Sequence, residues 1–72
     1  MGVNIRRIKA YRVYNDLGQL DMANKIGISH TSYCHKEQGL KEFTSSEVGK
    51  MAEVFNVEPG DLYSRESKLQ LL

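Results

Sequence analysis

The chain has 72 residues, with ten Lys and Arg against nine Asp and Glu and a net charge of +1, which is low for a domain that binds nucleic acid nonspecifically. This length allows one small core, and the lone Cys34 excludes an internal disulfide. No apolar stretch is long enough to span a membrane or resembles a signal peptide, so the sequence predicts a cytoplasmic protein without a membrane partner.

The first predicted helix covers residues 4–14. It has an apolar stripe at three- and four-residue spacing, which consists of Ile5, Ile8 and Tyr11. Four of the ten positive charges gather here, namely Arg6, Arg7, Lys9 and Arg12. They form either a solvated face or a nucleic-acid patch. Asp16 ends this helix, because Asp tolerates the left-handed conformation better than most residues.

The second and third predicted helices are joined by a tight turn. The second covers residues 19–26, and its inward residues are Met22, Ala23 and Ile26. Gly27 supplies the turn, Ile28 drops into the core, and Ser29 caps a third helix that runs from about 30 to 38 and stops at Gly39. This combination predicts a helix-turn-helix, a motif whose second helix commonly enters the DNA major groove.

A fourth helix is predicted over residues 45–55, after a capping box formed by Thr44 and Glu47. Its inward residues are Val48, Met51, Ala52 and Phe55. Pro59 then opens a short fifth helix. The predicted fold is all-α, a compact bundle of about five short helices, with a domain at 1–64 and a tail at 65–72. The leucines of this tail, Leu69, Leu71 and Leu72, are either frayed or part of a contact surface.

From Ile5 to Tyr63 the order of these signals resembles the lambda-repressor/Cro type of helix-turn-helix domain, the XRE family. The resemblance is carried by LGQLDMANKIGIS, KEQG and MAEVFNVEPGDLY. It implies a lambda-repressor-like fold, double-stranded operator DNA as the partner, and a structural ion pair between Arg12 and Glu37 that orients the third helix. The positions that match base-edge contacts are His30, Thr31, Ser32 and His35, with Cys34 nearby. The positions that match phosphate contacts are Gln19, Gln38 and Lys41.

The candidate base-reading residues include no Arg or Gln that would form the bidentate contact to guanine or adenine, which indicates loose base selection. Two residues of the third helix depart from the family pattern. Lys36 lies where an apolar residue is common, and Tyr33 lies where a smaller aliphatic residue is usual. Either they contact a partner protein, or Lys36 extends its ammonium to solvent and Tyr33 fills the core.

Enzymatic chemistry is not expected. His30, Cys34 and His35 lie on one short helix without a second cluster, which makes a poor tetrahedral metal site. A Cys-His dyad is equally unfavourable, because helical neighbours point about 100° apart. Glu47 is expected to be a cap rather than a catalytic acid. We therefore predict no catalytic residue, no metal and no cofactor.

Two functional classes remain. The first is a sequence-specific transcription regulator of the lysogeny/lytic switch of a phage, acting as a homodimer whose third helix reads operator DNA. The second is an antirepressor that binds the helix-turn-helix domain of a cognate repressor and blocks its DNA binding. In length and general character the chain resembles the small modulator-of-repression proteins that temperate phages encode beside a repressor.

Overall fold

A computed structural model describes residues 2–63 of the protein. Over these residues the fold is all-α, with four α-helices, one short 3-10 helix and no strand. The α-helices are α1 (Ile5–Tyr14), α2 (Gln19–Ile26), α3 (His30–Glu37) and α4 (Ser45–Phe55), and the 3-10 helix is η1 (Pro59–Leu62). Residue 64 and the predicted tail, with its three leucines, lie outside the described residues.

The expected fifth helix is therefore a single 3-10 turn, and residues 2–63 contain four α-helices. The segment begins with Pro59, which has no amide hydrogen, and continues with Gly60, a poor helix former. Its amide hydrogen bonds run from Asp61 to the Glu58 carbonyl and from Tyr63 to the Gly60 carbonyl, and this i to i−3 pattern is that of a 3-10 turn.

Hydrogen bonds join the two ends of the described chain beside the first turn of α1. Asn4 caps this helix, since its Oδ1 accepts from the backbone N–H of Arg7 at 3.1 Å. The Asn4 N–H donates to the carbonyl of Leu62 at 2.7 Å, and the Arg7 guanidinium donates to the carbonyl of Asp61 at 3.1 Å. At the other end of α1, Asp16 has φ 60°, which confirms the left-handed conformation predicted there.

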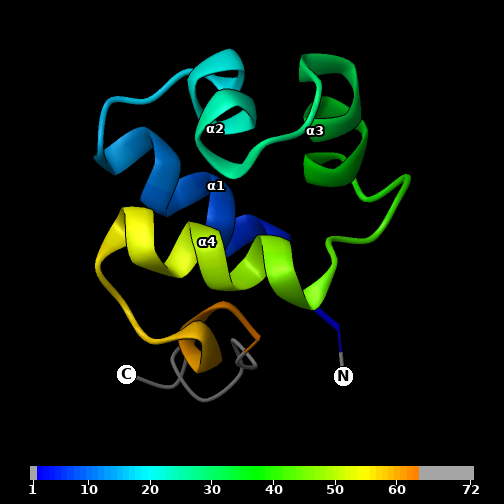
Figure 1. The fold of residues 1–72 in the computed structure, drawn as a ribbon. Coiled ribbons are helices and arrows are strands. Elements are labelled where there is room, and N and C mark those ends of the chain that lie inside the picture. Colours follow the sequence, from blue (N-terminus) through cyan, green and yellow to red (C-terminus); the bar gives the residue numbers. More distant parts are fainter. Residues whose placement is uncertain (1, 64–72) are drawn as a thin grey trace.

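The connection between α2 and α3 follows the predicted chemistry of caps and turns. Gly27 has φ 79° in the left-handed region, and Ser29 Oγ accepts from the N–H of Ser32 at 3.1 Å. Ala23 is fully buried, and the half-buried Ile28 packs against the core and donates its N–H to the Ala23 carbonyl. Figure 1 shows the two helices side by side at the top of the molecule.

Replacing Gly27 with Ala is expected to lower the free energy of unfolding by about 1 kcal/mol, because a Cβ disfavours φ 79°. Gly49 provides a matched control. It lies inside α4, where an added Cβ meets no atom within 4 Å, so Gly49→Ala is expected to stabilise by about 0.5–1 kcal/mol. Urea denaturation measures the free energy of unfolding of both variants. A change of the same sign in the two would contradict the expectation that they differ in sign.

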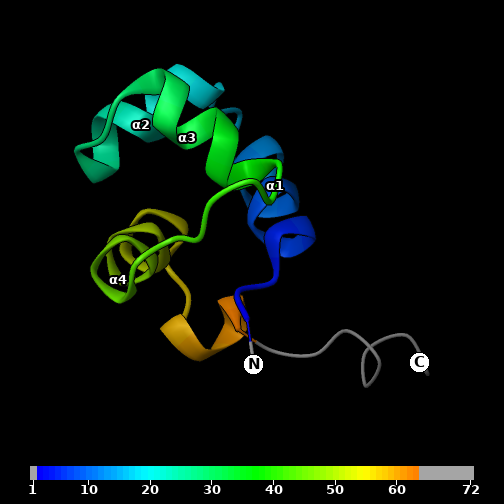
Figure 2. The ribbon, with the colours of Figure 1, turned by 90° about the vertical axis from the view of Figure 1, so that its right-hand side faces the viewer.

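Figures 1 and 2 show α2 and α3 above α1 and α4, with η1 below α4, and all five elements contribute to one core. Its buried apolar residues are Ile8, Met22, Ala23, Ile26, Tyr33, Phe43, Val48, Met51, Ala52, Phe55 and Leu62. The predicted capping box of α4 is present, with Thr44 Oγ1 and the Glu47 carboxylate each accepting from the other residue's N–H. In the described part of the chain, no helix has the length and apolar character needed to cross a membrane.

Candidate binding face on α3

The candidate base-reading residues lie on α3, and they differ in their exposure to solvent. Tyr33 and Glu37 are buried. Because successive residues on a helix are about 100° apart, positions 31, 35 and 38 lie on the side opposite these two. His30, Thr31 and Gln38 are exposed, whereas Ser32, Cys34 and His35 are half-buried. The outer face of α3, which we define as Thr31 and His35 together with the exposed His30 at its first position and Gln38 at its C-cap, is polar and carries no Lys or Arg.

The two other residues that match phosphate contacts lie outside α3. Lys41 is exposed in the loop between α3 and α4, while Gln19 is half-buried at the first position of α2. The amide group of Gln19 makes two internal hydrogen bonds. Its Nε2 donates to Glu37 Oε1 at 2.8 Å, and its Oε1 accepts from Cys34 Sγ at 3.2 Å. The side chain of Gln19 therefore joins α2 to α3.

Glu37 is the centre of a buried polar cluster that also contains Arg12, Gln19 and Tyr33. Arg12 donates from Nε to Oε2 at 2.8 Å and from Nη2 to Oε1 at 3.1 Å, which is the predicted ion pair between α1 and α3. Tyr33 Oη donates to Oε2 at 2.8 Å. With the Gln19 amide on Oε1, each carboxylate oxygen accepts two hydrogen bonds. Arg12 also donates from Nη1 to the carbonyl of Leu17 at 2.7 Å.

The ionisation of this cluster follows from its contacts. Burial by itself raises the pKa of Glu37, but hydrogen bonds from Arg12, Gln19 and Tyr33 outweigh it, so this pKa lies below its ordinary value of 4.5. The hydrogen bond to Glu37 raises the pKa of Arg12. The pKa of Tyr33 is raised, mainly by burial and to a smaller extent by the hydrogen bond to Glu37. At neutral pH the cluster is therefore a carboxylate held by one cation and two neutral donors.

A second ion pair, which sequence reasoning missed, joins α3 to α4. Lys36 Nζ lies 2.7 Å and 2.8 Å from the two carboxylate oxygens of Glu47, and both side chains are nearly buried. Burial alone would raise the pKa of Glu47, yet the hydrogen bonds from Lys36 and Thr44 lower it. The signal in the sequence was a lysine at a commonly apolar position, but nothing local pointed to Glu47.

The interpretation of Tyr33 and Lys36 as contacts for a partner protein is wrong for Tyr33. Its side chain is completely buried, and its ring packs edge-on against Phe43 with centroids 5.7 Å apart. Tyr33 therefore fills the core, which was the alternative interpretation. Lys36 neither extends into solvent nor presents a free charge, because Glu47 neutralises it.

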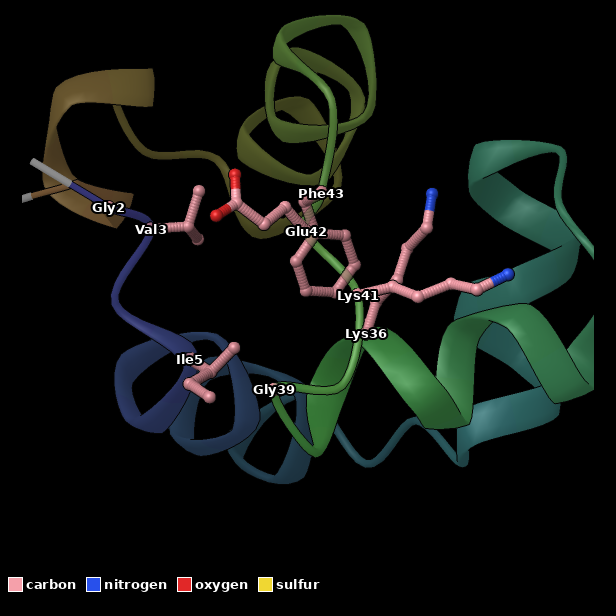
Figure 3. A pocket seen from close by; sticks show the side chains of 8 residues that line it. All are labelled: Gly2, Val3, Ile5, Lys36, Gly39, Lys41, Glu42 and Phe43. Carbon is pink, nitrogen blue, oxygen red and sulfur yellow. The ribbon is translucent and has the colours of Figure 1, made fainter.

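Figure 3 shows a pocket of about 200 Å³ between the N-terminal segment and the loop that follows α3. The apolar side chains of Val3, Ile5 and Phe43 line it, and the ammonium groups of Lys36 and Lys41 point away from it (Figure 3). Ligand pockets usually enclose about 300–1,000 Å³. This pocket is smaller than that range, and we assign it no ligand.

Within residues 2–63, no three His, Cys, Asp or Glu side chains are grouped so that they could hold a metal ion. The chemistry available on the surface of α3 is therefore hydrogen bonding by hydroxyl, imidazole and amide groups. Comparison of the chain with protein-family models, with curated proteins and with solved structures finds no match.

Proposed function

We propose that α2 and α3 form a helix-turn-helix of the lambda-repressor/Cro type, and that the protein is a small transcription regulator whose α3 binds operator DNA. The observation that carries this proposal is the fixation of α3 on three sides. Glu37 joins it to Arg12 of α1 and to Gln19 of α2, while Lys36 joins it to Glu47 of α4. A helix held in this way presents its outer face without further loss of conformational freedom when it binds.

The residues on the outer face of α3 suit base edges in a major groove. The Thr31 hydroxyl can donate or accept, its methyl can touch the methyl of thymine, and the imidazoles of His30 and His35 can donate to guanine acceptors. Lys41 follows Gln38 by three residues in the chain and is exposed, and it supplies a cation for a phosphate. Since Gln19 makes internal hydrogen bonds through its side chain, we assign it to positioning α3 rather than to a phosphate.

The test is a fluorescence-anisotropy titration of the intergenic DNA next to the protein's own gene, at several salt concentrations. Thr31→Ala is expected to weaken operator binding by about 1 kcal/mol, roughly fivefold, and to leave binding to unrelated DNA unchanged. Lys41→Ala is expected to weaken both and to lower the salt slope by about one. Lys9→Ala, at an exposed position on α1, is the comparison. It is expected to leave binding unchanged if the cations of α1 form a solvated face, whereas a loss equal to that of Lys41→Ala would indicate a nucleic-acid patch on α1. Equal affinity for operator and unrelated DNA would reject the proposal.

A second candidate is an antirepressor that covers the DNA-reading helix of a cognate phage repressor. The observation that favours it is the shortage of free positive charge on α3, whose single Lys36 is paired with Glu47. Two leucines are also exposed, Leu20 at the start of α2 by 52% and Leu40 after α3 by 69%. Apolar side chains of this kind suit a protein partner better than a phosphate backbone.

The same titration separates the two candidates when the repressor is added. A regulator that binds operator DNA raises the anisotropy of the DNA in the absence of the repressor, and its affinity falls steeply as the salt concentration rises. An antirepressor alone leaves the anisotropy of the DNA unchanged, but it releases the bound repressor from the DNA. Leu20→Ser or Leu40→Ser is then expected to weaken that release. Tight operator binding by the isolated protein, with no effect on the repressor, would reject the antirepressor candidate.

A further inference from the structure

The two histidines of the chain both lie on the outer face of α3. His30 is the first residue of the helix and is exposed, whereas His35 lies in the last turn and is half-buried. Across residues 2–63, neither imidazole forms a hydrogen bond or an ion pair. Both rings therefore keep their hydrogen-bonding capacity for a ligand.

The outer face of α3 has no cation that is charged at every pH. The one lysine of the helix, Lys36, has its Nζ 2.7 Å from Glu47 Oε1, and this carboxylate neutralises it. Histidine is the side chain that gains a proton just below neutral pH. A proton on an imidazole would thus be the first free positive charge on this face.

The two imidazoles differ in their position along α3. The backbone dipole of a helix favours a cation near the C-terminus and disfavours one near the N-terminus, where the free amide groups carry partial positive charge. His35 lies in the last turn, beside Lys36, and His30 lies at the N-terminal end. His35 is therefore the better position for a protonated ring.

The charged groups on the elements packed against α3 do not pair with His35. Arg12 of α1 is bound to Glu37, and Glu47 of α4 is bound to Lys36. The other charged residues on α2 and in the loop after α3 are Asp21, Lys25, Lys41 and Glu42. Within the described part of the chain, none of these forms an ion pair with His35, so its counter-charge has to come from a ligand.

We propose that a proton on His35 strengthens the binding of α3 to DNA, so that the protein binds its operator more tightly as the pH falls from about 7.5 to about 5.5. This inference rests on the proposed function. A neutral imidazole donates from one nitrogen and accepts with the other, whereas the protonated ring donates from both. Phosphate oxygens and the O6 and N7 atoms of guanine only accept, so both donors of the protonated ring suit DNA.

The contacts that orient α3 persist over this pH range. Burial by itself would raise the pKa of Glu37 and of Glu47, but hydrogen bonds, including those from Arg12 and Lys36, lower both values below 4.5. Both carboxylates therefore stay ionised at about pH 5.5, and α3 keeps its orientation. A change in DNA affinity between the two pH values then reports a group on the binding face rather than a change of fold.

Fluorescence anisotropy of the full chain with the intergenic DNA next to its own gene, at about pH 7.5 and about pH 5.5, tests the inference. The wild-type protein is expected to bind about fivefold more tightly at the lower pH, with a salt slope larger by about one. His35→Gln keeps a polar side chain that does not titrate, and its affinity is expected to be the same at both pH values. His35→Lys is expected to bind as tightly at about pH 7.5 as the wild type does at about pH 5.5.

His30→Gln is the matched control, because it removes the other histidine of the same helix and is expected to keep the pH dependence. Urea denaturation at both pH values checks that every variant is folded. An affinity of the wild type that does not change with pH, or a pH dependence that survives in His35→Gln, would overturn this inference and leave the proposed function intact. A protein that binds no DNA at either pH would reject both.

Discussion

Arg12→Met is expected to lower the free energy of unfolding at pH 7 by about 3–5 kcal/mol, because it leaves a buried carboxylate without its cation. Glu37 is almost fully enclosed, and its remaining donors, Gln19 and Tyr33, are neutral. Chemical denaturation measures the loss. The double variant Arg12→Met/Glu37→Met is expected to recover only part of it. The uncompensated charge is gone, but the Tyr33 hydroxyl and the Gln19 amide lose their acceptor.

The pH dependence separates this loss of charge pairing from a simple loss of packing. In the wild-type protein the pKa of Glu37 is lowered, so its stabilising contribution is complete above about 4.5 and is lost as the pH falls through the lowered value. In Arg12→Met the pKa of Glu37 is expected to rise, because burial raises it and the hydrogen bond from Arg12 that lowers it is gone. The stability gap between the two proteins should then narrow once the pH falls through the raised value. A gap that stays constant from pH 7 to pH 3 would contradict this account.

The local elements of the fold could be predicted because their signals lie close together in the sequence. Ser29 caps α3 through an amide three residues away, and Thr44 and Glu47 satisfy each other across the same spacing. The left-handed conformations of Asp16 and Gly27 depend only on the residue and its turn. The bounds of α2 and α4 were therefore predicted as the structure has them. The short η1 was misassigned because Pro59 can start either kind of helix.

The contacts that fix α3 were harder to predict, because they join residues that meet only after the helices pack. The Arg12–Glu37 pair was predicted from family resemblance and not from spacing. The hydrogen bonds of Gln19 with Cys34 and Glu37 span 15 and 18 residues, and the Lys36–Glu47 pair spans 11. Residue type alone leaves the partner of a buried lysine or glutamine undetermined. Such residues are predicted as surface contacts until the packing shows which polar groups they face.

Tyr33→Phe is expected to lower the free energy of unfolding by about 2 kcal/mol, because it removes a buried donor to a charged acceptor. The substitution keeps the ring, and with it the edge-on contact with Phe43, so the loss reports the hydroxyl alone. The pKa of Glu37 should rise at the same time, since the Tyr33 hydroxyl helps to lower it.

Tyr14→Phe provides the control for this experiment, because it removes the same hydroxyl from a side chain that is 84% exposed. Its effect on unfolding is expected to stay within about 0.5 kcal/mol. Urea denaturation compares the two variants, and NMR titration of Glu37 follows the change in pKa. A Tyr33→Phe protein that unfolds like the wild type would show that the hydroxyl contributes nothing to the cluster. The observed geometry predicts the reverse, because the Tyr33 hydroxyl donates at 2.8 Å to the same carboxylate that joins α3 to Arg12 of α1 and to Gln19 of α2.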